Sequence, residues 1–321
     1  MTATGPRRKK RLGRNRTRQV DSDDRQSVLA TLGDMPIQRD LLIEYLHQLQ
    51  DRYGHITGGR IVALADLMKL APAEIYEVAT FYHHFDIVTD GEPIPPDLTV
   101  GAEALICSLQ ANLGNNVRVQ RVPCVGRCDE APVAVVGKNP ISRATVAQVS
   151  DAIRQGSTAI AVQPDWIGVE EYRRGDGYRT YEACRVGSLS HDHILDELDG
   201  SDLRGLGGAG FPAGKKWRIL KDQPAPRLMA VNIDEGEPGT FKDRYYLERD
   251  PHRFIEGMLI AAEVIGIDCC YLYVRDEYPG VLQILEEAVK ELGPILDGKL
   301  PEIHLRRGAG AYICGEESAM I

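Results

Sequence analysis

The sequence lacks any uninterrupted apolar run of the roughly 18 residues that a transmembrane helix requires. The basic N-terminus is not followed by the apolar stretch of a signal peptide. The seven cysteines are spaced too irregularly for the disulfide framework of a small secreted protein. These absences predict a reduced, cytoplasmic protein with no membrane span.

Acidic side chains are missing from the first 18 residues, which contain eight Lys and Arg, although the whole chain has a net charge of −9. A basic tail can bind nucleic acid or target an organelle, but this one lacks the apolar residues that folding requires. We therefore predict a disordered tail over residues 1–26. Because the rest of the chain is acidic, we expect no nucleic-acid partner.

The composition is that of a globular protein, with 43% hydrophobic and 26% charged residues in a chain long enough for two domains. Apolar positions recur at three- and four-residue steps up to Gly54, and Pro72 suits the first turn of a later helix. Over residues 27–155 the pattern predicts a helical region followed by a small α/β unit. Helices are expected at 40–53, 61–68, 72–81 and 102–113, and strands at 117–122 and 133–136.

The C-terminal part alternates strands with long helices, after a mixed connection over 156–200 that we interpret as a linker. This alternation predicts βαβ units and a parallel sheet, whose ligands bind outside the carboxyl ends of the strands. Three polar, glycine-containing loops follow the strands, so we expect a ligand at that edge. The strands are expected at 228–232, 269–274 and 303–305, the helices at 251–265 and 281–292, and the loops at 233–239, 275–278 and 308–312.

A glycine-rich loop lies at residues 203–212, with four glycines in six positions. Such a loop lets backbone N–H groups approach a phosphate or a flat ring. Gly205, Gly207 and Gly210 satisfy the G-x-G-x-x-G pattern, but the residues before them are polar and turn-like. The pattern of a nicotinamide dehydrogenase requires a strand there, which argues against that class.

Three segments, 204–217, 232–244 and 307–318, agree in order and spacing with one known family. They resemble the flavoprotein subunit of respiratory complex I and its relatives in NAD-dependent formate dehydrogenases and NAD-reducing hydrogenases. The resemblance implies a Rossmann-like FMN- and NADH-binding domain over 201–321. It also implies transfer of hydride and electrons between NAD(H) and iron–sulfur centres through FMN, inside a multi-subunit redox complex.

The resemblance also assigns the cofactor-binding residues. No catalytic side chain is expected, because hydride chemistry belongs to the flavin and the nicotinamide. The family usually has Arg where this chain has Leu206, which removes one possible anion contact. By resemblance, Gly205, Gly207, Gly208 and Lys216 hold the FMN phosphate side, Asn232, Asp234 and Glu235 the ribityl chain and ring edge, and Phe211, Glu237, Tyr312, Gly315, Glu316 and Glu317 the nicotinamide pocket.

The N-terminal half resembles the partner subunit of the same assemblies, the thioredoxin-like [2Fe–2S] protein, at residues 73–82 and 123–132. An in-line fusion of the two units is most like the β subunit of an NAD-dependent formate dehydrogenase, whose partners would be a formate-oxidising subunit and iron–sulfur subunits. The alternatives are a diaphorase subunit of a hydrogenase or of NADH–quinone oxidoreductase, and a non-catalytic remnant.

The resemblance predicts a metal-site defect. The family's cluster needs a C-x₄-C pair and a C-x₃-C pair; Cys124 and Cys128 supply only the second. The best alignment lacks the first pair after residue 99 and makes Cys107 a helix residue. We therefore expect the [2Fe–2S] cluster to be lost. The family's [4Fe–4S] domain would follow residue 321, so we also expect a truncated chain.

Overall fold

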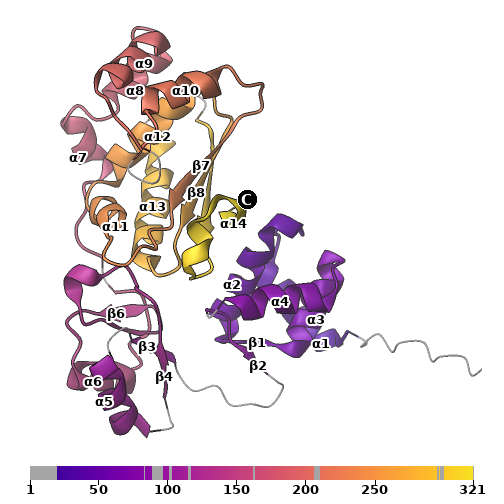
Figure 1. Cartoon of the computed structure of the whole chain (residues 1–321). Coiled ribbons are helices and arrows are strands. Elements are labelled where there is room, and N and C mark those ends of the chain that lie inside the picture. The colour runs from indigo at the N-terminus through magenta and orange to yellow at the C-terminus, as the bar shows by residue number, and fades with distance from the viewer. Residues whose placement is uncertain are drawn as a thin grey trace, which may run out of the picture. The chain divides into compact units, whose positions relative to one another are not determined.

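The computed structural model describes residues 20–82, 84–88, 97–100, 103–114, 117–161, 163–205, 210–294, 296 and 300–320. It forms two compact units, Met1–Glu92 and Pro93–Ile321. Figure 1 shows both, and their positions relative to one another are not determined. No helix in the described ranges is long and apolar enough to cross a membrane.

The first unit is built from helices whose apolar faces form its core. The predicted helices are confirmed: Gly54 ends one in the left-handed conformation (φ 71°) and Pro72 opens another. The first helix begins at Ser22, inside the predicted tail, because Asp21 caps its N-terminus through two backbone N–H groups and Val28 and Leu32 bury its apolar face. The elements are α1 (Ser22–Leu32), η1 (Arg39–Leu41), α2 (Leu42–Tyr53), β1 (Ile56–Thr57), α3 (Gly58–Met68), α4 (Pro72–Phe81) and β2 (Ile87–Val88).

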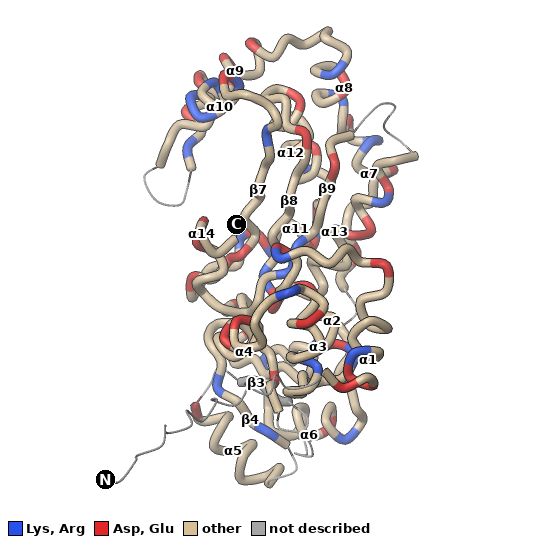
Figure 2. Tube along the Cα trace, turned by 90° about the vertical axis from the view of Figure 1, so that its right-hand side faces the viewer, with Lys and Arg blue, Asp and Glu red and all other residues tan. Residues whose placement is uncertain are grey.

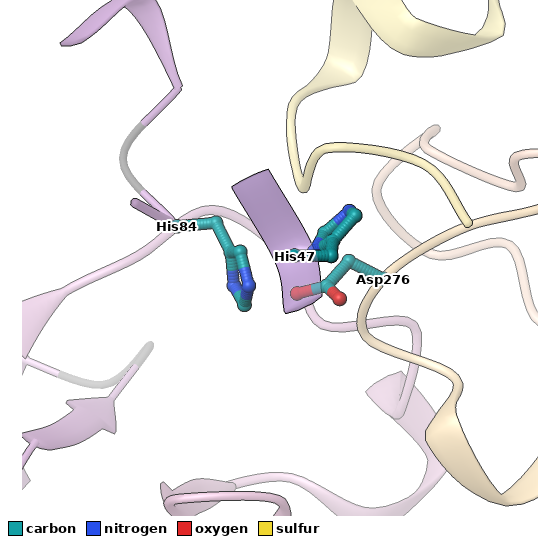
Figure 3. A group of neighbouring side chains, drawn as sticks. All are labelled: His47, His84 and Asp276. Carbon is teal, nitrogen blue, oxygen red and sulfur yellow. The ribbon is translucent and has the colours of Figure 1, made fainter. Parts of the chain in front are cut away.

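Two histidines lie side by side in this unit. His47 of α2 is 4% exposed, and its ring centroid lies 5.0 Å from that of His84. Figure 3 labels both side chains. Phe85 also packs on both rings. Asp276, drawn in the same picture, belongs to the other unit, whose placement relative to these rings is not determined. His83 lies outside the described residues. The two rings therefore serve as aromatic packing within the first unit.

The second unit begins with a thioredoxin-like fold. Strand β3 pairs parallel to β4 and antiparallel to β5, which pairs antiparallel to β6. Leu109 of α5 and Val149 of α6 pack with Val136 in one apolar core. The short strands β3 and β6 were not predicted, because neither has a clear alternating pattern. The elements are β3 (Asp97–Val100), α5 (Glu103–Leu113), β4 (Arg118–Arg121), η3 (Cys128–Glu130), β5 (Ala134–Val136), β6 (Asn139–Ile141) and α6 (Val146–Arg154).

A three-stranded parallel sheet, in the order β7-β8-β9, follows in the same unit (Figure 2). Cys270, Leu272 and Val274 of β8 are fully buried against the connecting helices α12 and α13. Pro251 opens α12 and Gly266 ends it, which explains its predicted boundaries. The βαβ prediction is confirmed. The elements are β7 (Leu228–Ile233), α11 (Lys242–Leu247), α12 (Pro251–Ile265), β8 (Cys269–Val274), α13 (Pro279–Leu292), β9 (Glu302–Arg307), η4 (Tyr312–Gly315) and α14 (Glu317–Met320).

The segment predicted as a linker, 156–200, folds onto this sheet domain. Val169, Tyr178 and Tyr181 belong to its apolar core. Three helices form within this segment, so the linker prediction is wrong for them. The sequence did not reveal them because each is short and buries only one or two residues, which leaves no clear periodic pattern. They are α7 (Val169–Arg174), α8 (Arg179–Arg185) and α9 (His191–Gly200), followed by α10 (Ala213–Lys221).

Candidate FMN and cysteine sites

Two of the three motifs meet at the carboxyl end of β7. The side-chain Nδ2 of Asn232 donates to the Gly315 carbonyl oxygen at 2.9 Å, and its Oδ1 accepts from the Asp234 N–H at 3.0 Å. Asn232 thus joins the loop after β7 to the loop after β9. The predicted edge is the place where these residues gather, since all three strands run parallel.

Asp234 lies at the centre of this junction. Its Oδ2 is buried and has no hydrogen-bond partner in the described part of the chain. Burial first, and then the Glu277 charge, raise the pKa of Asp234 to about 7. A carboxylate oxygen without a partner is costly in a protein interior, so it marks a place for a donor from a ligand.

Two glycines line the same carboxylate. A Cβ on Gly315 would lie 3.0 Å from Asp234 Oδ2 and 3.1 Å from the Asp234 carbonyl oxygen. A Cβ on Gly308 would lie 3.3 Å from Asp234 Oδ1. Asp234 therefore lies close to both glycines, and a larger side chain at either position would displace the Asp234 carboxylate. The geometry fits a ligand that donates hydroxyl hydrogen bonds, as the ribityl chain of FMN does.

Glu235, which the resemblance assigns to the flavin, accepts hydrogen bonds from donors of the protein itself. It is 4% exposed, and its carboxylate accepts from the Asp243 N–H at 3.0 Å, the Arg244 N–H at 3.4 Å and the Tyr278 hydroxyl at 3.0 Å. Both oxygens are therefore occupied by protein donors, two of them at the N-terminus of α11. In this geometry Glu235 holds the loop in place.

The glycine loop follows α9, and backbone hydrogen bonds join the residues at its two ends. The Gly205 N–H donates to the Phe211 carbonyl oxygen at 3.0 Å, and the Ala213 N–H to the Leu203 carbonyl oxygen at 2.8 Å. Leu206, Gly207 and Gly208 lie outside the described residues. No strand among the described residues leads into the loop, as the sequence indicates. Lys216 follows on α10 and is exposed.

The residues assigned to the nicotinamide pocket are mostly exposed. Phe211 is 46% and Tyr312 64% exposed, and a Cβ on Gly236 would lie 3.2 Å from the Tyr312 ring. Glu237 and Glu317 are exposed and Glu316 accepts from the Ser318 N–H at 2.9 Å. Exposed aromatic rings and carboxylates suit a flat, hydroxyl-rich ligand. The Glu316 carboxylate already accepts a hydrogen bond at the start of α14.

Cys124 and Cys128 lie against the loop that follows β7. Their Sγ atoms are 3.2 Å apart, and the Gly239 N–H donates to Cys128 Sγ at 3.2 Å. Burial opposes ionisation of Cys124, but hydrogen bonds from Cys128, Gly126 and Gly239 lower its pKa below the usual value. The hydrogen bond with Cys124, and then burial, raise the pKa of Cys128.

Two buried arginines fix the cysteine segment to the sheet domain. Arg275 donates to the Cys124 carbonyl oxygen at 2.7 Å and also to the Glu235 carbonyl oxygen. Arg244 donates to the Gly126 carbonyl oxygen at 3.1 Å and to Asp129 at 2.6 Å. The sequence reasoning missed both roles. The available signal was their position, since Arg275 opens the loop after β8 and Arg244 ends the second matched motif.

The cysteine ligand set does not fit a [2Fe–2S] cluster, which needs four protein ligands. All seven cysteines are described, and no third Cys, His, Asp or Glu joins Cys124 and Cys128 within ligand reach in the described ranges. Cys107 lies exposed on α5, as predicted, and only two residues separate β3 from α5. That connection has no room for a C-x₄-C loop.

Both halves of the chain match known families. Residues 198–321 match the Nuo51 FMN-binding domain, and residues 28–157 match the thioredoxin-like [2Fe–2S] ferredoxin. The chain therefore combines these two folds, as predicted. The ferredoxin match weighs weakly against the expected loss of the cluster, because it identifies the fold and does not supply the missing ligands.

The relatives are subunits of NAD(H)-linked complexes. The chain is 46% identical over 169 residues to an NADH-quinone oxidoreductase subunit of Aquifex aeolicus, covering 50% of the chain and 39% of that protein. It is 31% identical over 333 residues to the NAD-reducing hydrogenase HoxS subunit alpha of Cupriavidus necator, covering 88% of the chain and 55% of that protein.

A solved structure is similar to most of the chain. The chain matches a crystal structure of an NAD⁺-reducing [NiFe]-hydrogenase in the H₂-reduced state, with a TM-score of 0.72 and 29% identity, over 89% of the chain and 54% of that chain. The chain thus spans about half the length, or less, of the relatives it matches. What those complexes do as a whole does not transfer to it directly.

Proposed function

We propose that the chain is an electron-input flavoprotein module that transfers hydride and electrons between NAD(H) and iron–sulfur centres through FMN. The observation that carries this proposal is the buried, unpartnered Oδ2 of Asp234 at the junction of two matched motifs. The family matches and the names of the relatives support the same cofactors.

The chain's own residues would bind and orient the cofactors. Asp234 would accept hydrogen bonds from ribityl hydroxyl groups, while the closed base at Gly205 would present the glycine loop to the phosphate. Phe211 and Tyr312 would border the nicotinamide. FMN supplies the chemistry that no side chain has, because it accepts a hydride and releases electrons singly. Glu235 and Asn232 would keep the loops in register.

The proposal assigns no [2Fe–2S] cluster to this chain, although its N-terminal half matches a [2Fe–2S] ferredoxin. We expect this chain to hold no [2Fe–2S] cluster by itself, because only Cys124 and Cys128 are placed as ligands. Electrons would leave through a [4Fe–4S] site outside residues 201–321 or through a partner subunit. Free cysteines throughout the chain agree with a reduced cytoplasmic setting.

Three kinds of complex are candidates for the electron partner of this chain. The in-line fusion of the two units suggests the β subunit of a formate dehydrogenase, with a formate-oxidising partner. The named relatives belong to a hydrogenase and to NADH–quinone oxidoreductase, so they support those partners about equally. Co-purification of the native complex, followed by assays with formate, hydrogen and quinone, distinguishes these partners.

FMN binding tests the site itself. We expect Gly315→Val to weaken FMN binding at least tenfold, because its side chain would push Asp234 aside. Gly293→Val is the matched control, since nothing lies within 4 Å of a Cβ there. Titration of FMN fluorescence with each protein gives the affinities. Equal affinity in both variants would show that FMN does not bind beside Asp234.

A further inference from the structure

The cysteine pair has features that the proposed electron-transfer function does not use. The Sγ atoms of Cys124 and Cys128 lie 3.2 Å apart, and both thiols are free. A disulfide bond is about 2.05 Å long, so a movement of roughly 1 Å would join them. Among the described residues, no third metal-ligating side chain lies within reach of the two sulfur atoms.

The surroundings favour thiol–disulfide exchange at this pair. Cys128 is exposed, so an external disulfide can reach it, while Cys124 lies half-buried behind it. Backbone N–H groups donate to both sulfur atoms, from Gly126 to Cys124 at 3.4 Å and from Gly239 to Cys128 at 3.2 Å. Each sulfur atom is thus fixed by a backbone donor close to the other, and thiol–disulfide exchange needs two sulfur atoms within such reach.

The pair is also attached to the loop that contains Asp234. Gly239 lies in the segment 234–240 that follows β7, and its N–H bonds to Cys128 directly. Arg275 bridges the Cys124 and Glu235 carbonyl oxygens, and Tyr278 donates to the Glu235 carboxylate at 3.0 Å. A change at the sulfur atoms therefore acts on the same loop that we propose to hold FMN.

We propose that Cys124 and Cys128 form a reversible disulfide by exchange with a low-molecular-weight disulfide, and that this bond loosens the 234–240 loop. The exposed Cys128 thiol attacks the external disulfide, gives up its proton, breaks the external S–S bond and releases one thiol. Cys124 then attacks the mixed disulfide, forms the intramolecular S–S bond and releases the second thiol. The pair loses two electrons and two protons, and the external disulfide gains them.

The expected consequence is weaker flavin binding in the oxidised state. A sulfur atom drawn into a disulfide moves from its position beside Gly239 and accepts hydrogen bonds less well than a thiolate. Loss of one hydrogen bond corresponds to an affinity for FMN about fivefold lower. This consequence rests on the proposed FMN site, whereas formation of the disulfide does not.

Peptide mapping tests the bond directly. Trypsin cleaves after Arg121, Arg127 and Lys138, so the two cysteines fall in separate peptides, 122–127 and 128–138. After incubation of the full chain with oxidised glutathione, we expect these peptides to be joined by a disulfide. Cys107, which is also exposed, is the internal control and should carry only glutathione. Glutathione on Cys124 and Cys128 without a link between them would overturn the proposal.

Two further measurements separate this proposal from the proposed function. FMN affinity is measured for the oxidised and reduced chain, with Cys128→Ser as a variant that cannot form the bond. We expect the fivefold difference to disappear in Cys128→Ser and to persist in Cys107→Ser. A joined peptide with no FMN binding in either state would leave the disulfide standing and refute the flavin site. A [2Fe–2S] spectrum after reconstitution with iron and sulfide would refute the disulfide role.

Discussion

Among single residues, Asp234 is the most important for the proposed FMN site. Its carboxylate is enclosed by Gly308 and Gly315, and Oδ2 finds no partner in the described part of the chain. Sequence reasoning placed Asp234 in the site by resemblance, but only the fold shows that it is buried without a donor. Glu235, its neighbour, has the same assignment by resemblance, and its carboxylate accepts from two N–H groups at the N-terminus of α11.

The pKa of Asp234 predicts a pH dependence of stability. Because the folded-state pKa is raised to about 7, the folded protein retains a proton that the unfolded chain loses near pH 4. Stability without FMN should therefore fall as pH rises from about 4 to about 7 and stay level above. We expect Asp234→Asn to be more stable than the original protein at pH 8, on the order of 2 kcal/mol, and nearly equal at pH 4.

Urea unfolding of the FMN-free protein at both pH values gives this difference. Asp165→Asn, at an exposed position, serves as the control and should change neither value. An equal effect of Asp234→Asn at both pH values would contradict a titrating, buried carboxylate.

Glu317 leads to a prediction about nucleotide choice. It is exposed on α14, next to the Gly315 and Tyr312 residues assigned to the nicotinamide pocket. A carboxylate there would repel the 2′-phosphate of NADPH, so we expect NADH to be preferred. Glu317→Lys should shift the ratio of the two affinities toward NADPH about tenfold. Glu286→Lys, exposed on α13, is the control, and an unchanged ratio in both variants would remove Glu317 from the pocket.

At the scale of elements, the sequence predicts best where long periodic segments meet clear caps. The limits of α12 and β8 were predicted residue for residue, because Pro251 and Gly266 bracket the helix and β8 is a compact apolar run. Helices α7 to α9 were missed, since each is short and is held by contacts from elsewhere, such as Tyr178 hydroxyl with His252 Nδ1 at 2.8 Å. Tertiary contacts of this kind leave no local pattern.

The connection between the cysteine segment and the sheet domain is also tertiary. Arg275 is 4% exposed and reaches Cys124, Glu235 and Glu277 together. Lys cannot make these forked contacts, so Arg275→Lys should lower the free energy of unfolding by about 2–3 kcal/mol. Amide hydrogen exchange in residues 124–128 should become faster. Arg253→Lys is the control, because Arg253 is exposed and forms its salt bridge with Asp250 on the same helix turn.

Unfolding in urea and hydrogen exchange measured by mass spectrometry report these two effects. Loss of stability without faster exchange at the cysteine segment would mean that Arg275 stabilises the domain but does not fix that segment.

At the scale of the whole molecule, one chain contains a match to the thioredoxin-like [2Fe–2S] ferredoxin and a match to the Nuo51 FMN-binding domain. The order of the two, and the class of cofactor, follow from the sequence motifs. The ligand set of the cysteine site does not follow from the fold match, because the thioredoxin-like fold forms here with only Cys124 and Cys128 close together. The fold persists because its core, around Leu109 and Val136, does not depend on the cluster.

Anaerobic titration of the FMN-loaded chain with NADH tests whether the bound flavin accepts a hydride from NADH. If the junction at Asp234 holds FMN beside the nicotinamide pocket, NADH should bleach the visible absorbance of the flavin with one equivalent per bound FMN. Gly315→Val should show little bound FMN, while Gly293→Val should behave as the original chain. Bound FMN that NADH leaves oxidised, or a chain that binds no FMN, would contradict the account.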